Sequence, residues 1–226
     1  MSDNPPERLQ RRLQHADTPV QVFAGLDEAY DSIDKLAAEY VSSNSVHLDC
    51  CANCSWCCHL RVDAKAHEVL AIAHYVQKHF PTEKRNALID RLQRHSARVR
   101  KLTYVQHLAT NVACPLLVDG RCSAYAVRPF GCRRKHSQTV KNCEDSFNHP
   151  EDLTSPPDEH MGLLTTFCQG EHSLQTAFAV SGYDTTGYEF GTALLKALTN
   201  PKSWRRWKKK KKTFLNALTV PANIQN

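Results

Sequence analysis

The sequence is poor in glycine and has no long apolar run. Only 8 of its 226 residues are glycine, and it contains no internal repeat or long low-complexity segment. No apolar stretch approaches the roughly 18 residues of a membrane-spanning helix, and the opening residues, MSDNPPER, lack an apolar signal core. We therefore expect a cytoplasmic protein without a transmembrane segment. The absence of a catalytic triad, a phosphate-binding loop and a dinucleotide fingerprint argues against familiar hydrolases and nucleotide-dependent enzymes.

Cysteine, in contrast, is abundant. The chain has ten cysteines, although a protein of this length can bury a sizeable core without covalent cross-links. Persistent disulfides are rare in a reducing compartment, so grouped cysteines there are typical of metal ligands or redox groups. A disulfide framework would also need a secretory signal, which the sequence does not show.

Apolar residues recur at every third or fourth position in several segments, which predicts amphipathic helices. We expect helices over 26–41, over 62–80, from 82 to about 108 and over 188–198. Asp119-Gly120 predicts a short hairpin over 116–123, because both residues accept positive φ angles. The predicted fold is mainly α, a helical scaffold around an irregular cysteine-rich metal-binding core with a short β-hairpin. Within one globular unit we expect an N-terminal helical segment at 1–45, a cysteine-cluster metal-binding domain at 46–145, and a C-terminal helical region with a basic tail at 146–226.

The cysteines are grouped along the chain. Five stand between positions 50 and 58, four follow at 114, 122, 132 and 143, and Cys168 is alone. Two-residue gaps from Cys51 to Cys57 let a loop direct successive sulfurs at one centre, as in zinc and iron–sulfur sites. The side chains of adjacent Cys57 and Cys58 diverge, which favours two metal centres, or one ligand beside a spectator. Small buried core cysteines are the alternative, but they have no reason to group beside turn residues.

Several motifs together resemble a known family. They are Cys51-x2-Cys54-x2-Cys57-Cys58, Cys114-Pro115-Leu116, Gly120-Arg121-Cys122, Tyr125, Arg128-Pro129, Cys132-Arg133 and Cys143. Over about residues 50–143 this pattern resembles the YkgJ-type CxxCxxCC family of zinc- or iron-chelating cysteine-cluster proteins. The resemblance implies that metal or cofactor ligands come in two groups of four, namely Cys51, Cys54, Cys57 and Cys58, and Cys114, Cys122, Cys132 and Cys143.

The resemblance also has departures and an enzymatic alternative. Ser55-Trp56 stands where many members have a small Gly-Ala pair, which makes this loop bulkier. One relative, flagellin lysine N-methylase, carries a similar cluster, so a cluster-dependent enzyme such as a protein lysine N-methylase is an alternative function. Cys50 and Cys168 lie outside the family pattern. Cys50 could exchange with Cys51 as a ligand, and we expect Cys168 to be a packed thiol.

The sequence leaves the cofactor open between zinc and an iron–sulfur cluster. Three close cysteines and a distant Cys114-Pro115 are similar to the bacterial ferredoxin order, which favours an iron–sulfur cluster for the first group. Zinc accepts any four sulfurs in a tetrahedron at about 2.3 Å. Either centre would be anionic, and cationic donors stabilise such charge. We expect Arg128 to take this role, whereas Arg133 fits equally well as a surface residue.

A second feature is the basic segment Trp204-Arg205-Arg206-Trp207 followed by Lys208 to Lys212. If one helix continues from Ser203, the aromatic and apolar residues up to position 218 share one side and most lysines the other. Such a helix can contact an anionic partner, either nucleic acid, as an adaptor would, or a membrane surface. The alternative is a terminal helix that its aromatics dock on the core. The formal net charge of +6 is largely a local property of this segment.

Overall fold

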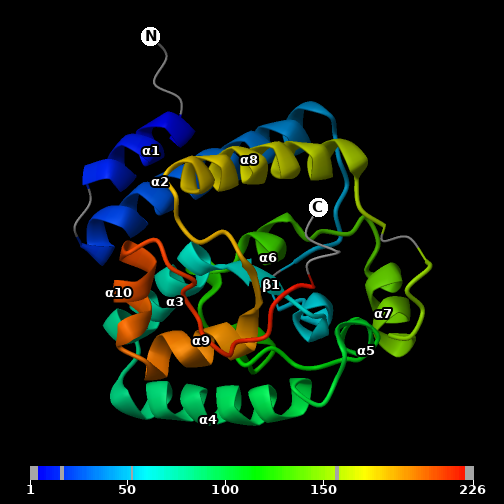
Figure 1. Ribbon diagram of the computed structural model, residues 1–226. Helices are drawn as coiled ribbons and strands as arrows, with labels where there is room; N and C mark the ends of the chain where they lie inside the picture. Colours follow the sequence, from blue (N-terminus) through cyan, green and yellow to red (C-terminus); the bar gives the residue numbers. More distant parts are fainter. Residues whose placement is uncertain (1–4, 16–17, 52, 156–157, 222–226) are drawn as a thin grey trace.

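The computed structural model describes residues 5–15, 18–51, 53–155 and 158–221 (Figure 1). This part of the chain is mainly helical, as predicted, with two small two-stranded antiparallel sheets. None of its helices is long and apolar enough to cross a membrane. The α-helices are α1 (Pro5–His15), α2 (Pro19–Ser43), α3 (Ala66–His79), α4 (Thr82–Val99), α5 (Tyr104–Leu108), α6 (Phe130–Arg134), α7 (Val140–Asn148), α8 (Met161–Val180), α9 (Phe190–Thr199) and α10 (Lys202–Lys208). The shorter elements are the 3-10 turns η1 (Trp56–His59) and η2 (Tyr125–Val127) and the strands β1 (Asp63–Lys65), β2 (Leu117–Val118), β3 (Arg121–Cys122) and β4 (Gly187–Glu189).

The helices form two layers around one core. Helices α1, α2 and α8 pack together along one side, and α9 packs between α3 and α4 on the other (Figure 1). Leu26, Ile72, Leu88 and Leu194 are fully buried where these helices meet. Core residues from all three predicted ranges belong to one contiguous hydrophobic cluster. The boundaries at 45 and 145 stay a prediction.

Two helix boundaries differ from the sequence prediction because of capping. Helix α2 begins at Pro19 rather than 26, since the Thr18 hydroxyl accepts a hydrogen bond from the backbone N–H of Gln21 in a capping box. The predicted helix from 82 to about 108 is two helices. Helix α4 ends at Val99, and a second capping box, between Thr103 and Gln106, starts α5.

The local sequence predicts one of the two sheets and not the other. The predicted hairpin is confirmed: β2 pairs with β3, and Asp119 and Gly120 have φ angles of +50° and +73° at its turn. The pairing of β1 with β4 is not predicted by the local pattern. It joins Asp63 to Glu189, residues far apart in the sequence, over a short register. This sheet ties the segment after the cysteine doublet to the start of α9.

The buried carboxylate of Glu189 links this sheet to α4 through a hydrogen bond. Glu189 is 2% exposed and caps α9, accepting hydrogen bonds from the backbone N–H groups of Gly191 at 3.0 Å and Thr192 at 2.7 Å. The Nε2 atom of His95 on α4 donates to the same carboxylate at 2.9 Å. Burial opposes ionisation of Glu189, but these hydrogen bonds outweigh it and lower its pKa to about 2. Glu189 therefore fixes α4, β4 and α9 to one another.

Candidate metal centre

All ten cysteines carry free thiols, and seven of them lie outside the α-helices. Cys57 and Cys58 sit in η1, a turn with no fully buried residue. Cys143 and Cys168 lie on helices α7 and α8, and Cys168 is exposed, so the expectation of a packed thiol there is wrong. The other predicted ligands are Cys51 and Cys54 in the segment before η1, Cys114 before β2, Cys122 in β3 and Cys132 in α6.

Backbone hydrogen bonds hold the doublet beside the second group of cysteines. The N–H of Cys114 donates to the carbonyl of Cys58 at 2.8 Å, and that of Val112 donates to the carbonyl of His59 at 2.9 Å. The guanidinium of Arg91 on α4 donates to the next carbonyl along the second segment at 2.8 Å. The segments carrying the doublet and Cys114 therefore run side by side, anchored to α4.

Five half-buried thiols lie at this junction, and several are close enough to affect the pKa of another. A negative charge on Cys57 or Cys122 raises the pKa of Cys132, and a negative charge on Cys132 or Cys122 raises that of Cys114. Burial raises the pKa of Cys114 and of Cys132 to about 12. The hydrogen bond with the Cys58 thiol, followed by burial, raises the pKa of Cys57. The thiols of Cys57, Cys114 and Cys132 are therefore protonated at neutral pH, and a metal cation would displace their protons on binding. We call Cys57, Cys58, Cys114, Cys122 and Cys132 the inner thiols.

Four more thiols form an outer set. Cys57 is the inner thiol that affects the pKa of outer thiols. Cys50 interacts electrostatically with Cys143, Cys57 and Cys51, and Cys54 interacts with Cys57, Cys50 and Cys143. Burial raises the pKa of both Cys50 and Cys54. We call Cys50, Cys51, Cys54 and Cys143 the outer thiols. Sequence reasoning placed Cys50 outside the ligand pattern, but its pKa is affected by Cys143, Cys57 and Cys51, which are predicted ligands.

Helix α7 brings Cys143 to the outer thiols through one aromatic side chain. The ring of Phe147 lies edge-on to that of Trp56, with centroids 5.1 Å apart, and 4.9 Å from that of His59. The side-chain amide of Asn111 donates to the carbonyl of Phe147 at 2.6 Å. None of the residues of α7 is fully buried. The bulky Trp56, which departs from the family pattern, is thus the surface on which α7 packs.

Two cations, Arg128 and Lys135, affect the pKa values of inner thiols. Burial raises the pKa of Cys122, and the nearby guanidinium of Arg128 opposes that rise. Arg128 also lowers the pKa of Cys132 against the effect of burial, and its guanidinium stacks 4.0 Å from the ring of Tyr125. The charge of Lys135 likewise lowers the pKa of Cys57, against the larger effects that raise it. These cations are placed to balance negative charge on thiolates.

Arg133 has a structural contact instead. Its buried guanidinium pairs with Asp34 at 2.5 Å, donates to the carbonyl of Ala126 at 2.8 Å and lies 4.4 Å from the ring of Tyr30. The suggestion that Arg133 is a surface residue is therefore wrong. It pins α6, which carries Cys132, to α2.

A second contact, missed in the sequence, fixes the same helix. Glu68 is 5% exposed and accepts hydrogen bonds from the Tyr30 hydroxyl at 3.1 Å and from the backbone N–H groups of Phe130 at 2.5 Å and Lys65 at 2.6 Å. Burial raises its pKa. Because Phe130 begins α6, the carboxyl group of Glu68 sets the position of Cys132 relative to α2 and α3.

The thiols interact in pairs rather than around one point. Within the four described ranges, no three side chains of histidine, cysteine, aspartate or glutamate are arranged to hold one metal ion. The donor type nevertheless fits the predicted cofactors, because soft thiolates select zinc and iron–sulfur clusters. Inner and outer thiols together include all eight predicted ligands and add Cys50.

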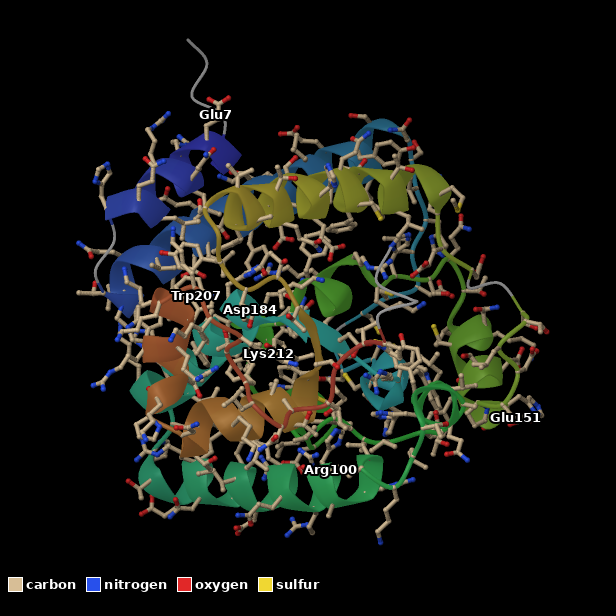
Figure 2. The ribbon with its side chains drawn as sticks, in the orientation of Figure 1. Glu7, Arg100, Glu151, Asp184, Trp207 and Lys212 are labelled. Atoms are coloured by element: carbon tan, nitrogen blue, oxygen red, sulfur yellow. The ribbon has the colours of Figure 1, made fainter. Side chains whose placement is uncertain are left out.

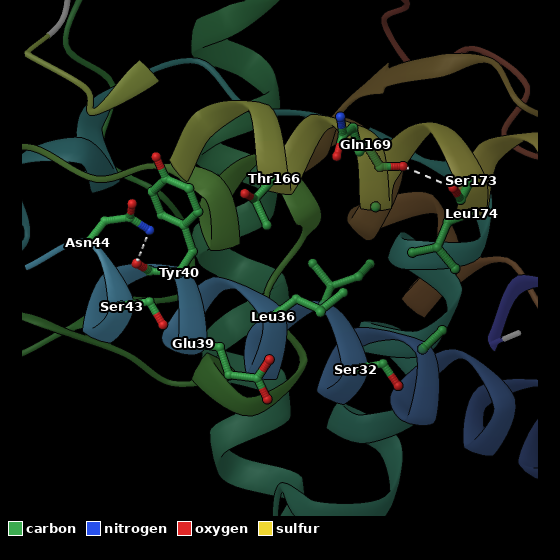
Figure 3. Close-up of a pocket in the computed structure, with 13 residues that line it drawn as sticks. Ser32, Leu36, Glu39, Tyr40, Ser43, Asn44, Thr166, Gln169, Ser173 and Leu174 are labelled. Carbon is green, nitrogen blue, oxygen red and sulfur yellow. Dashed lines mark hydrogen bonds between the residues drawn. The ribbon is translucent and has the colours of Figure 1, made fainter. Parts of the chain in front are cut away.

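A groove lies apart from these thiols. It has a volume of about 540 Å³ and runs between α2 and α8, lined by Leu36, Tyr40, Thr166, Gln169 and others (Figure 3). None of its lining residues is a cysteine. The enzymatic alternative predicts a substrate pocket, and the lining of this groove gives no sign that it is connected with the thiols.

No family model, curated protein or solved structure matches the chain. The resemblance to the CxxCxxCC family, and the ligand set that it implies, therefore stay predictions that rest on the cysteine motifs.

Proposed function

We propose that the protein binds zinc or an iron–sulfur cluster through eight cysteine thiolates: Cys51, Cys54, Cys57, Cys58, Cys114, Cys122, Cys132 and Cys143. The observation that carries the proposal is the set of inner thiols. These five thiols come from four separate segments, each affects the pKa of another or has its own pKa affected by one, and none belongs to a disulfide. Free thiols of this kind have no packing reason to face one another, and a metal gives them one.

The inner and outer thiols favour two centres. The thiols of Cys57 and Cys58 are hydrogen-bonded to each other. One zinc ion or one iron–sulfur cluster takes about four thiolates, so eight thiolates are enough for two centres. Cys57 interacts with both sets, which makes it the natural boundary between the centres. Four thiolates around a divalent ion leave a net charge of about −2. Arg128 and Lys135 would offset part of that charge at the inner centre.

When bound, the metal would supply cross-linking between distant segments, because thiolate–metal bonds contribute directly to folding free energy. Arg91 and Glu68 would keep Cys114 and Cys132 at the positions where they meet the doublet. The outer centre would join α7 to η1 through Cys143. Metal binding therefore predicts a loss of stability on chelation that begins at α7, the helix with no buried residue.

The test compares Cys132→Ser with Cys168→Ser in protein purified without oxygen. Cys132 is an inner thiol, and Cys168 is an exposed thiol on α8 that serves as the matched control. We expect Cys132→Ser to lower zinc or iron content and Cys168→Ser to leave it unchanged. Iron with visible absorption would identify a cluster, and a colourless zinc protein would identify zinc sites. Equal metal content in both variants would contradict the assignment of Cys132.

A further inference from the structure

The basic segment does not form the continuous helix considered above. Helix α10 ends at Lys208, and the next three residues fold back on it. Lys210 has a φ angle of +55°, and its N–H donates to the carbonyl of Trp207 at 2.8 Å. The N–H of Lys211 donates to the carbonyl of Arg206 at 3.1 Å. A left-handed residue just past the helix end is a common helix stop, so the lysines occupy a turn and not a helix face.

The core holds this turn at both ends. Before it, Trp207 is fully buried, and its ring stacks on Tyr183 with centroids 4.2 Å apart. After it, Phe214 is 1% exposed and lies edge-on to Tyr188 at 5.1 Å. Between them, the N–H of Thr213 donates to the carboxylate of Asp184 at 2.7 Å. Figure 2 shows Trp207, Asp184 and the last lysine of the turn in one region of the molecule. The alternative in which aromatics dock this segment on the core is therefore right.

The turn concentrates positive charge without neutralising it. We define the basic turn as Arg205, Arg206, Lys209, Lys210, Lys211 and Lys212. In the described part of the chain none of these six cations pairs with a carboxylate. The guanidinium of Arg206 donates to the carbonyl of Lys212 at 2.9 Å, which closes the turn on itself. The four lysines are exposed. Six like charges held this close repel one another, and an anion would relieve that repulsion.

More cations continue the surface toward the end of α4. The guanidinium of Arg100 donates to the carbonyl of Asn216 at 2.5 Å. Asn216 follows the last lysine of the basic turn by four residues, so the two lie at most about 14 Å apart. Lys101, next to Arg100, is exposed as well. The cationic surface therefore spans two elements, each fixed to the core, and is organised before any partner arrives.

We propose that the basic turn binds the phosphate backbone of nucleic acid. Duplex DNA carries one negative charge for about every 1.7 Å of its axis, which gives a dense line of partners for a compact cation cluster. Fixed cations lose little conformational entropy when they bind. Contacts to phosphate oxygens carry no sequence information, so we expect the binding to be independent of base sequence. Trp207 and Phe214 are buried and are not free to stack on bases.

An anionic membrane fits the same charges less well. Stable membrane attachment of a basic segment needs a second signal, such as inserted apolar side chains or a lipid chain. The aromatic side chains here are committed to the core: Trp204 packs 5.7 Å from the ring of Phe23, and Trp207 is fully buried. Within four positions of the turn along the sequence, Leu215 is the large apolar side chain that is exposed. One leucine does not make an inserting face.

The experiment measures binding of the full-length protein to a fluorescent DNA duplex of about 20 base pairs over a series of salt concentrations. We expect log affinity to fall linearly with log salt and to be the same for unrelated sequences. The double variant Lys209→Gln and Lys211→Gln should lower the slope by about 2, since each phosphate contact contributes about 0.9.

The matched control is the double variant Lys35→Gln and Lys141→Gln, which removes the same charge from exposed lysines on α2 and α7. An unchanged slope in the control supports the assignment to the basic turn. An equal loss in the control would show an effect of net charge and overturn it. Absence of DNA binding at low salt would also overturn it, as would binding to phosphatidylserine vesicles but not to DNA. Tryptophan fluorescence checks that each variant keeps Trp207 buried.

Discussion

Replacing Glu189 by glutamine removes one negative charge from a buried site and leaves its shape nearly unchanged. The carboxylate is 2% exposed and receives hydrogen bonds from His95 on α4 and from the first backbone N–H groups of α9. Glutamine resembles the protonated form of glutamate in size and charge. The variant therefore measures what ionisation of Glu189 contributes to the junction of α4, β4 and α9.

The magnitude follows from the pKa of Glu189, about 2 in the folded protein against an ordinary value of 4.5. Each pKa unit corresponds to about 1.36 kcal/mol, so ionised Glu189 stabilises the fold by about 3 kcal/mol. A folded-state pKa below the unfolded value gives stability that is fully present above pH 4.5. That stability is lost as the pH falls from 4.5 toward 2. The difference in unfolding free energy between wild type and Glu189→Gln should therefore shrink over the same pH range.

The assay is urea unfolding in reducing buffer at several pH values, with Glu39→Gln, an exposed carboxylate on α2, as the control. We expect Glu189→Gln to be less stable than wild type by about 3 kcal/mol near pH 7 and to approach it near pH 2. The control should stay within about 0.5 kcal/mol of wild type. If the difference in unfolding free energy between wild type and Glu189→Gln does not shrink as the pH falls, the role assigned to the ionised carboxylate is refuted.

Two further predictions concern buried groups near the same core. Burial, followed by the charge of Lys65, lowers the pKa of His67 to about 3, so the folded protein loses up to about 1.4 kcal/mol per pH unit as the pH falls from 6.5 toward 3. His67→Phe, which keeps a ring against Phe178, should reduce this loss in thermal melts across that range, and an unchanged pH slope would contradict it. Gly191→Ala would place a methyl group in steric conflict with the ring of His95, whereas the methyl group of Gly120→Ala meets nothing within 4 Å and costs only backbone strain. Gly191→Ala should therefore lower the midpoint of urea unfolding by clearly more than Gly120→Ala, and the reverse order would show that His95 moves freely.

Local patterns predict what local chemistry determines. The mainly helical class follows from apolar spacing, and the hairpin follows from Asp119-Gly120, whose positive φ angles need no tertiary support. Helix boundaries were less accurate where a cap decides them, as at Thr18 and Thr103. Both caps are visible in the sequence as a threonine followed three positions later by glutamine.

Tertiary contacts explain most of what the sequence did not foretell. The β1–β4 pairing is short and joins residues far apart in the sequence. Nothing in the local sequence distinguishes Glu68 and Glu189 from exposed acids, because the three hydrogen-bond donors to each of them are brought together by the fold. Local periodicity did not predict the end of α10, because Lys210 adopts a left-handed conformation between two buried aromatics. The cysteine motifs named the eight candidate ligands, whereas the position of Cys50 depends on how the chain folds before η1.

The metal content of the protein purified without oxygen tests the central claim most directly. Elemental analysis for zinc and iron, together with a visible spectrum, reports both the occupancy and the kind of centre. The proposed inner and outer centres predict near-stoichiometric zinc, or iron with visible absorption, and a metal content that falls with Cys132→Ser and is unchanged with Cys168→Ser. Protein that is folded but contains neither zinc nor iron would contradict the account.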